Sequence, residues 1–286
     1  IENETKENST SANLEKNILV EDPPKQELEI LTNLYRQKQF GQLLDKVSVL
    51  ELKYPNSLFL NNIAGASHTV LGHLDEAIKA YSKVTSLNPD SADAYYNLGN
   101  VLKKKGELEK ALDSYKRALI LKPNFADTYY NMGNVFQEEG KFEEAIDTYK
   151  RALSLNSNNF GAHNNVGNIL KKQGKFKEAL DSYKRALSLN PSYAEAYNNM
   201  GIVFQEQGKF EEALDSYKSA LSLNPNYPEA YNNIGIVLQE QGKFEEALDS
   251  YKSALSLNPN YAEACNNMGI ALQEQGKFED AIKIYD

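Results

Sequence analysis

The stretch YNNMGIVFQEQGKFEEALDSY, from Tyr197 to Tyr217, predicts two amphipathic helices joined by a tight turn. One apolar face with helical spacing comprises Tyr197, Met200, Gly201 and Phe204. A second such face comprises Phe210, Ala213, Leu214, Tyr217, Ala220 and Leu221. Gly208 stands between them, where a left-handed residue closes a helix at little cost.

Nearly the same stretch recurs along the chain with a fixed period of 34 residues. The first-helix glycine recurs at Gly65, Gly99, Gly133, Gly167, Gly201, Gly235 and Gly269. The second-helix alanine recurs at Ala77, Ala111, Ala145, Ala179, Ala213, Ala247 and Ala281, and the tyrosine at Tyr81, Tyr115, Tyr149, Tyr183, Tyr217, Tyr251 and Tyr285. One helix pair cannot bury its apolar faces alone, so we expect the pairs to stack into an array whose units contact only their neighbours.

This period and pattern resemble the tetratricopeptide repeat family over residues 24–286. The resemblance implies an all-α fold, a right-handed superhelical α-solenoid of stacked antiparallel helix pairs. We expect residues 1–23 to be a disordered or partly helical segment, and residues 24–57 to be a degenerate first repeat in which Leu31 and Leu43 replace the glycine and the alanine. The array then spans residues 58–286, with the last repeat truncated and repeats beginning at Leu58, Ala92, Ala126, Phe160, Ala194, Pro228 and Ala262.

Two local features predict how the helices begin and pack. Gly201 and Ala213 carry almost no side chain, which lets the two helix axes approach closely. Before each of the last three first helices, a polar residue and a glutamate have the spacing of a capping box. These pairs are Ser192 with Glu195, Asn226 with Glu229, and Asn260 with Glu263. We therefore expect the three glutamates to cap helices.

Asparagines form a regular series on the first helices, opposite the apolar face. The series comprises Asn97, Asn131, Asn165, Asn199, Asn233 and Asn267, hereafter the ladder asparagines. In three repeats a second asparagine follows: Asn100, Asn134 and Asn168. This pattern resembles the repeat domain of O-linked N-acetylglucosamine transferase. The resemblance implies that first helices line a concave groove, in which an asparagine ladder holds the backbone of an extended polypeptide.

The chemistry of the carboxamide agrees with such a role. An amide side chain offers both an acceptor and donors, as a peptide unit does. Neighbouring first helices lie about 10 Å apart and an extended peptide rises about 3.3 Å per residue, so one asparagine would meet about every third residue. The structural alternative is that the asparagines bond to those of neighbouring repeats and serve only stacking and solubility.

The positions just before the turn differ in charge along the array. They are basic at Lys103, Lys104, Lys171 and Lys172, and acidic or neutral at Gln137, Glu138, Gln205, Glu206, Gln239, Glu240, Gln273 and Glu274. One hypothesis is a ligand with an acidic stretch toward the N-terminal repeats and a basic stretch toward the C-terminal ones. The alternative is a solvated face of mixed charge.

Composition excludes several functional classes. The net charge of -9 argues against a nucleic-acid backbone as the main partner. The lone Cys265 fits a reducing compartment, and with no membrane-length apolar run we expect a cytoplasmic protein with no membrane insertion. His68, His73 and His163 have no companions at metal-ligand spacing, and Cys265 and His163 occupy core positions. We therefore expect no metal, no cofactor and no enzymatic activity.

The sequence favours a non-enzymatic scaffold that binds a protein or an extended peptide segment. One alternative is the substrate-recognition arm of a larger enzyme, a glycosyltransferase or sulfotransferase, whose catalytic domain follows Asp286. A second alternative is a self-assembly module that stacks head to tail through its last repeat. A clamp for the terminal carboxylate of a chaperone is a further alternative, because Lys103–Lys104 and Lys171–Lys172 faintly resemble the paired basic residues of such clamps.

Overall fold

The computed structural model describes residues 21–285, and between these residues the regular structure is entirely helical. The expected all-α fold of stacked helix pairs is confirmed. The prediction of a disordered or partly helical segment falls mainly on residues 1–20, which lie outside the described part of the chain. The chain divides into two compact units, Ile1–Pro123 and Asn124–Asp286.

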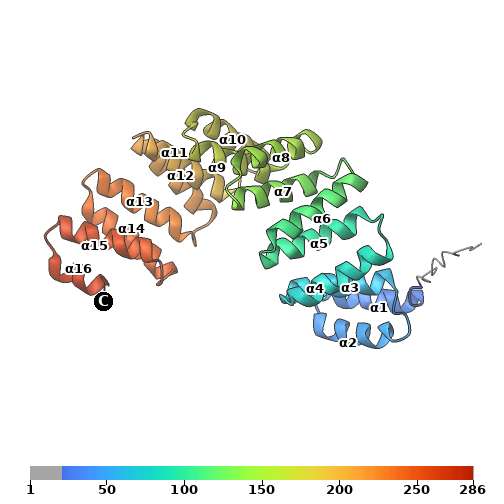
Figure 1. Ribbon diagram of the computed structural model, residues 1–286. Coiled ribbons are helices and arrows are strands. Elements are labelled where there is room, and N and C mark those ends of the chain that lie inside the picture. Colours follow the sequence, from blue (N-terminus) through green and yellow to red (C-terminus); the bar gives the residue numbers. More distant parts are fainter. Residues whose placement is uncertain (1–20, 286) are drawn as a thin grey trace, which may run out of the picture. The chain divides into compact units, whose positions relative to one another are not determined.

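Each unit is a succession of helix pairs (Figure 1). The first unit contains α1 (Lys25–Arg36), α2 (Phe40–Glu51), α3 (Leu58–Leu71), α4 (Leu74–Leu87), α5 (Ala92–Lys105) and α6 (Leu108–Leu121). The second contains α7 (Ala126–Glu138), α8 (Phe142–Leu155), α9 (Phe160–Lys172), α10 (Phe176–Leu189), α11 (Ala194–Glu206), α12 (Phe210–Leu223), α13 (Pro228–Glu240), α14 (Phe244–Leu257), α15 (Ala262–Glu274) and α16 (Phe278–Tyr285). Within each unit, the second helix of a pair also contacts the first helix of the next pair.

Glycines end the first helices as the sequence predicts. Gly208 has φ +69°, in the left-handed region that glycine adopts without a steric penalty. The same conformation recurs at Gly72, Gly106, Gly140, Gly174, Gly242 and Gly276. The following residue donates its N–H back into the helix, as Lys209 does to the carbonyl of Phe204 at 2.9 Å. The helix pairs from α3–α4 onward are therefore closed by the same glycine geometry, and in the first pair Lys38 takes this place with φ +58°.

The glycine in the middle of each first helix makes room for a tyrosine of the same repeat. A Cβ added to Gly235 would lie 2.4 Å from Cε1 of Tyr251. In five other repeats, a Cβ added to the equivalent glycine would lie 2.5 to 2.9 Å from the tyrosine ring of the same repeat. The ring of Tyr251 is fully buried. The sequence predicts a close approach of helix axes at this glycine, and the structure shows that the space is filled by the aromatic ring.

The first repeat solves the same packing problem with different residues. Leu31 stands at the glycine position and Val47 at the tyrosine position, and both are buried, at 0% and 3% exposure. They share a core with Leu43 and Leu60. Because Val47 is much smaller than tyrosine, the first helix of this repeat can carry a leucine where the others carry glycine. The repeat is degenerate in sequence but complete in its packing.

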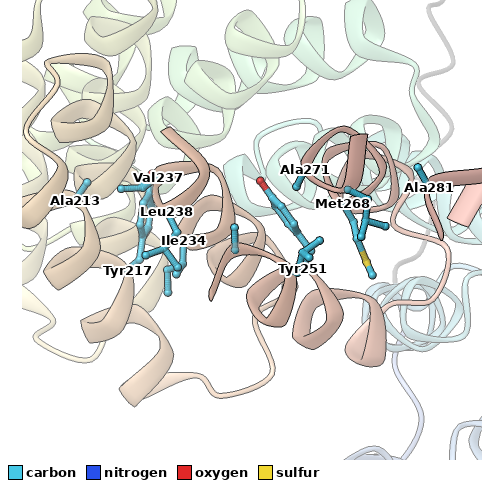
Figure 2. Packing of buried hydrophobic residues seen from close by; sticks show 12 residues of the cluster. Ala213, Tyr217, Ile234, Val237, Leu238, Tyr251, Met268, Ala271 and Ala281 are labelled. Carbon is cyan, nitrogen blue, oxygen red and sulfur yellow. The ribbon is translucent and has the colours of Figure 1, made fainter. Parts of the chain in front are cut away.

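The core of the second unit is continuous across its last repeats. Figure 2 shows Tyr217 beside Ile234 and Leu238 of the next repeat, and Tyr251 beside Met268. The buried tyrosine therefore packs against its own first helix and against that of the following repeat. This double contact couples neighbouring helix pairs, as expected for a repeat array.

The capping boxes predicted at three repeats are wrong. At α11, α13 and α15 the residues before the helix are Tyr193, Tyr227 and Tyr261, and none makes a side-chain cap. The reason is that each helix begins one residue later than a capping box requires. The polar residue is held instead in a local turn, in which Oδ1 of Asn190 accepts from the N–H of Ser192 at 3.2 Å.

Candidate functional site

The ladder asparagines of the second unit lie on consecutive first helices that contact one another, α7, α9, α11, α13 and α15. Four of them donate a hydrogen bond to an asparagine of the preceding repeat. The Nδ2 atoms of Asn199, Asn233 and Asn267 bond to Oδ1 of Asn164, Asn198 and Asn232, at 3.1, 3.0 and 3.1 Å. Nδ2 of Asn165 bonds to Oδ1 of Asn134 at 2.9 Å, because the preceding repeat has Tyr130 in place of the buried asparagine.

The accepting asparagines are buried and extend these links further. Asn164 and Asn232 are both 0% exposed. Their own Nδ2 atoms donate to carboxylates of the following repeat, Glu195 at 3.0 Å and Glu263 at 3.2 Å. These two glutamates, predicted to cap helices, therefore bond to a neighbouring repeat. A pair of adjacent asparagines thus links three consecutive first helices.

The structural alternative was that the asparagines bond to neighbouring repeats and do nothing else. The structure shows the bonds between repeats for Asn165, Asn199, Asn233 and Asn267. These bonds leave part of each amide uncommitted. An asparagine side chain has two N–H donors and a carbonyl with two lone pairs. For Asn165, Asn199, Asn233 and Asn267, the Oδ1 atom accepts no hydrogen bond from any residue between 21 and 285. Asn199 is the most enclosed of the four, at 8% exposure.

Asn97 differs from these four. It lies on α5 of the first unit, and it makes no bond to Asn62, the equivalent asparagine of the preceding repeat, whose Nδ2 donates to the carbonyl of Leu58 at 2.9 Å. Its side chain makes no hydrogen bond to the residues that the structure describes. It is therefore a half-buried amide with its full hydrogen-bonding capacity. Asn131 holds the equivalent place on α7.

The second asparagines have a role in the core that the sequence did not reveal. Oδ1 of Asn100, Asn134 and Asn168 accepts from the hydroxyl of the buried tyrosine in the same repeat, at 2.8, 2.7 and 2.8 Å. Tyr183, which donates to Asn168, has a pKa raised well above its usual value, mainly by burial. We expected these three asparagines to contact a ligand, but their carbonyl groups satisfy a buried phenol.

Repeats without the second asparagine satisfy the tyrosine in another way. Ile202 and Ile236 replace it, and the hydroxyl then donates to Gln205 or Gln239, at 2.9 Å in each repeat. Comparing repeats within the sequence would have exposed this switch. A lysine occupies the glutamine position in two repeats, at Lys103 and Lys171, and both retain the asparagine.

The charged residues predicted to line a groove are partly engaged with neighbouring side chains. Lys104 donates to the carbonyl of Thr69 at 3.0 Å. Lys172 lies 5.3 Å from the ring centre of Phe142, a cation–π distance. Glu240 accepts from Gln205 at 3.3 Å. These contacts connect neighbouring repeats, so the charges at the helix ends also support stacking.

Lys171 and Glu206 belong to neighbouring repeats and interact electrostatically. Burial lowers the pKa of Lys171, the nearby Glu206 carboxylate raises it, and Lys172 lowers it further. Glu206 itself is exposed, and Lys103 is half-buried. Some of the charged side chains predicted to line the groove, such as Lys104 and Glu240, contact a neighbouring repeat. Others, such as Glu206, are exposed to solvent.

The histidines and the cysteine of the described residues are not grouped with other metal-ligating side chains. Between residues 21 and 285, no group of three or more His, Cys, Asp and Glu side chains is placed to hold a metal ion. His68 and His73 lie with ring centres 5.7 Å apart, and Sγ of Cys265 donates to the carbonyl of Ile284 at 3.1 Å. None of the helices α1 to α16 is both long and apolar enough to cross a bilayer.

Family models match almost the whole array. A model described as TPR repeat matches residues 67–106, 99–140, 133–174, 167–208 and 204–242. Two models described as Tetratricopeptide repeat match residues 228–261 and 250–283. A comparison with curated proteins finds no match.

Solved structures of other proteins share the fold. The structure of YrrB, described as a TPR protein with an unusual peptide-binding site, is 30% identical and covers 66% of this chain and 97% of its own, with a TM-score of 0.53. Pseudomonas aeruginosa pilF is 25% identical and covers 68% and 88%, with a TM-score of 0.61. The Cut9–Hcn1 assembly of the APC/C is 18% identical and covers 87% and 49%, with a TM-score of 0.69, a likeness of fold alone.

Proposed function

Because the chain belongs to the tetratricopeptide repeat family, we propose that it is a non-enzymatic scaffold that binds an extended peptide. The ladder asparagines hold the peptide backbone along consecutive first helices. The observation that carries this proposal is a row of carboxamides that keep hydrogen-bonding capacity after stacking. Asn199, Asn233 and Asn267 each retain an acceptor and a donor, and Asn165 retains its acceptor. YrrB, a relative with a described peptide-binding site, supports the same class of ligand.

The remaining capacity of each amide matches a peptide unit. After its bond to the preceding repeat, Asn233 retains one N–H and an Oδ1 acceptor. A peptide unit offers one C=O and one N–H, so a single ladder asparagine can satisfy both. First helices in contact lie about 10 Å apart, and an extended chain rises about 3.3 Å per residue. A guest would therefore meet one amide about every third residue.

The bonds between repeats favour binding rather than compete with it. An asparagine whose Nδ2 is already held has lost most of its rotamer freedom before a ligand arrives. Ordering a free side chain at an interface costs about 0.5–1.5 kcal/mol, and this cost is largely met on folding. Asn165, Asn233 and Asn267 are half-buried, so they are fixed yet retain access to solvent.

Recognition through the backbone makes binding tolerant of sequence, and charge then biases which peptides bind. Glu206 and Glu240 are exposed near the ends of α11 and α13. A basic residue in the guest would interact favourably with either carboxylate. Surface ion pairs contribute about 0.2–1 kcal/mol each and weaken with salt. The proposal therefore expects a salt-dependent preference on top of a salt-independent affinity.

The test compares two triple variants of the full chain on an array of random peptides. The ladder variant changes Asn165, Asn199 and Asn233 to Ala. The control variant changes Asn190, Asn224 and Asn258 to Ala. In the turns between repeats, Asn190 accepts two hydrogen bonds and Asn224 and Asn258 accept one each. Both variants lose three asparagines and at least three hydrogen bonds, about 1 kcal/mol for each bond.

We expect the ladder variant to lose at least about tenfold in affinity, since several charge-neutral hydrogen bonds are removed from the interface. The control variant should bind as the parent does. Circular dichroism of both variants verifies that they remain helical. A helical ladder variant that still binds peptides with the parent's affinity would show that the asparagines serve stacking alone.

A further inference from the structure

The first unit contains a depression of about 420 Å³ among α1, α3, α4 and α5. This volume lies within the range of about 300–1,000 Å³ that is usual for ligand pockets. Its apolar walls come from Tyr35, Phe59, Ile63 and Ala66. We call it the apolar pocket. Asn97, the first ladder asparagine, also lines it, so the apolar pocket is continuous with the first position of the ladder.

The residues that make this pocket apolar are those in which its repeat departs from the others. Ile63 stands where all the later repeats have a ladder asparagine. Phe59 stands where the last three repeats have a glutamate, and Ala66 stands where three repeats have the second asparagine. Phe59 and Ile63 are only partly buried, in contact with the core of the first repeats. The departures therefore gather at one place on one face.

Three polar residues that line the pocket beside these walls are hydrogen-bonded within the protein. The Thr32 hydroxyl donates to the carbonyl of Leu28 at 2.8 Å, and Nδ2 of Asn62 donates to the carbonyl of Leu58 at 2.9 Å. Tyr81 also lines the pocket, and its hydroxyl is hydrogen-bonded to Thr69. These bonds engage the hydroxyls of Thr32 and Tyr81 and the Nδ2 group of Asn62.

Arg36 and Asn97 bring hydrogen-bonding groups to the pocket that no described residue engages. The guanidinium of Arg36 is exposed and forms no ion pair or hydrogen bond with residues 21–285. The amide of Asn97 makes no hydrogen bond with them either. A cation and a carboxamide at the edge of an apolar space are complementary to a guest that carries both a carboxylate and a peptide backbone.

We propose that the apolar pocket accepts a bulky aliphatic or aromatic side chain of the bound peptide, next to an aspartate or glutamate whose carboxylate pairs with Arg36. Asn97 bonds the backbone beside that apolar residue. This inference rests on the proposed function, because it adds a side-chain preference to peptide binding at Asn97, the ladder asparagine of the first unit. It turns a scaffold indifferent to side chains into one that selects a two-residue signature, apolar and acidic.

The test starts with selection of displayed random peptides of about 12 residues on the full chain, at a length that spans about three rungs. We expect the selected peptides to share a large apolar residue beside an acidic one. The strongest peptide is then synthesised with an amidated C-terminus, and its affinity is measured by fluorescence polarisation. The same peptide with its apolar residue changed to serine, or its acid to lysine, provides matched ligands.

Two variants of the protein test the pocket itself. Ile63→Asn restores the residue found in later repeats, so it is compatible with the repeat fold. We expect it to weaken binding of the selected peptide by about tenfold or more, because the pocket loses apolar surface. Arg36→Glu should reverse the preference between the acidic peptide and its lysine form. Ile120→Asn makes the same chemical change at an exposed residue of α6, 69% accessible, and should leave binding unchanged.

The outcomes separate this inference from the proposed function. Peptides that bind, require the ladder asparagines and are indifferent to Ile63→Asn and Arg36→Glu would overturn the pocket and leave the scaffold intact. If no peptide is enriched, the proposed function fails, and the pocket assignment fails with it. If the selected peptide binds only with a free terminal carboxylate, the assignment of Arg36 to an acidic side chain is wrong.

Discussion

Replacing Gly235 by alanine tests the packing that defines the repeat. The new methyl group would lie 2.4, 2.7 and 2.8 Å from Cε1, Cδ1 and Cζ of Tyr251. These distances are far below the 3.5–4.0 Å at which carbon atoms attract one another. Tyr251 is fully buried and its hydroxyl donates to Gln239 at 2.9 Å, so the ring cannot move aside freely.

The size of the effect follows from two opposing contributions. Overpacking a core costs typically about 1–3 kcal/mol. Alanine in a helix interior is favoured over glycine by about 0.8–1.0 kcal/mol. We take the upper part of the overpacking range, because the clash is with ring carbons held on both sides. Gly235→Ala should therefore reduce the free energy of unfolding by about 1–2 kcal/mol.

The same substitution should have the opposite sign once the ring is removed. The first repeat shows the compatible combination, with Leu31 at the glycine position and Val47 at the tyrosine position. In a Tyr251→Val background, Gly235→Ala should stabilise by up to about 1 kcal/mol, since only helix propensity and cavity filling remain. The coupling between the two sites should then be about 2–3 kcal/mol, large for a pair of residues.

The parent, Gly235→Ala, Tyr251→Val and the double variant form a double-mutant cycle. Urea unfolding of these four proteins, followed by circular dichroism, gives their free energies of unfolding. Repeat arrays do not always unfold in a single step, so hydrogen exchange of the amides in α13 and α14 provides a local measurement. Additive effects of Gly235→Ala in the two backgrounds would refute the reasoning. Such a result would mean that the ring and the glycine do not share the same space.

Three further predictions follow from the hydrogen bonds and pKa values. Tyr183→Phe removes the donor to Asn168 and should lower stability by about 1 kcal/mol, seen as a lower melting temperature. Asn232→Leu deletes two hydrogen bonds to the following repeat, one donated to Glu263 and one accepted from Asn267, and should cost about 1–3 kcal/mol, with faster hydrogen exchange in α15. Burial raises the pKa of Tyr81 from 10.0 to about 12. The unfolded state therefore loses this proton first, so stability should fall as the pH rises from 10.0 to about 12, and Tyr81→Phe should reduce that fall in a urea titration across the same pH range.

Much of the fold follows from spacing alone. The helical period of the apolar residues, the recurrent glycines and the unit length predict helix pairs and their stacking without reference to coordinates. The departures occur where one residue decides a local geometry. The capping boxes were wrong because Tyr193 takes the position before the helix, one residue after the serine that would have capped it.

The site was predictable in part. Spacing places the ladder asparagines on one face, but it cannot decide which hydrogen bonds they make. That choice depends on side-chain torsions and on the distance to the next repeat, so the bond from Asn233 to Asn198 appears only in three dimensions. The tyrosine acceptors were readable from the sequence, since Asn168 and Gln205 occur in complementary repeats. The apolar pocket depends on Ile63 and Phe59 meeting residues of three other helices, α1, α4 and α5, which the sequence does not show.

The interlocked glycine and tyrosine also constrain how such a chain can evolve. A repeat copied by duplication inherits both residues, and a later change at either one alone produces a collision or a hole. Replacing both residues by another compatible pair therefore passes through a single substitution that lowers the stability of the protein. The repeat with Leu31 and Val47 is one such pair, and the barrier between the two solutions helps to explain why duplicated copies remain alike there while neighbouring surface positions diverge.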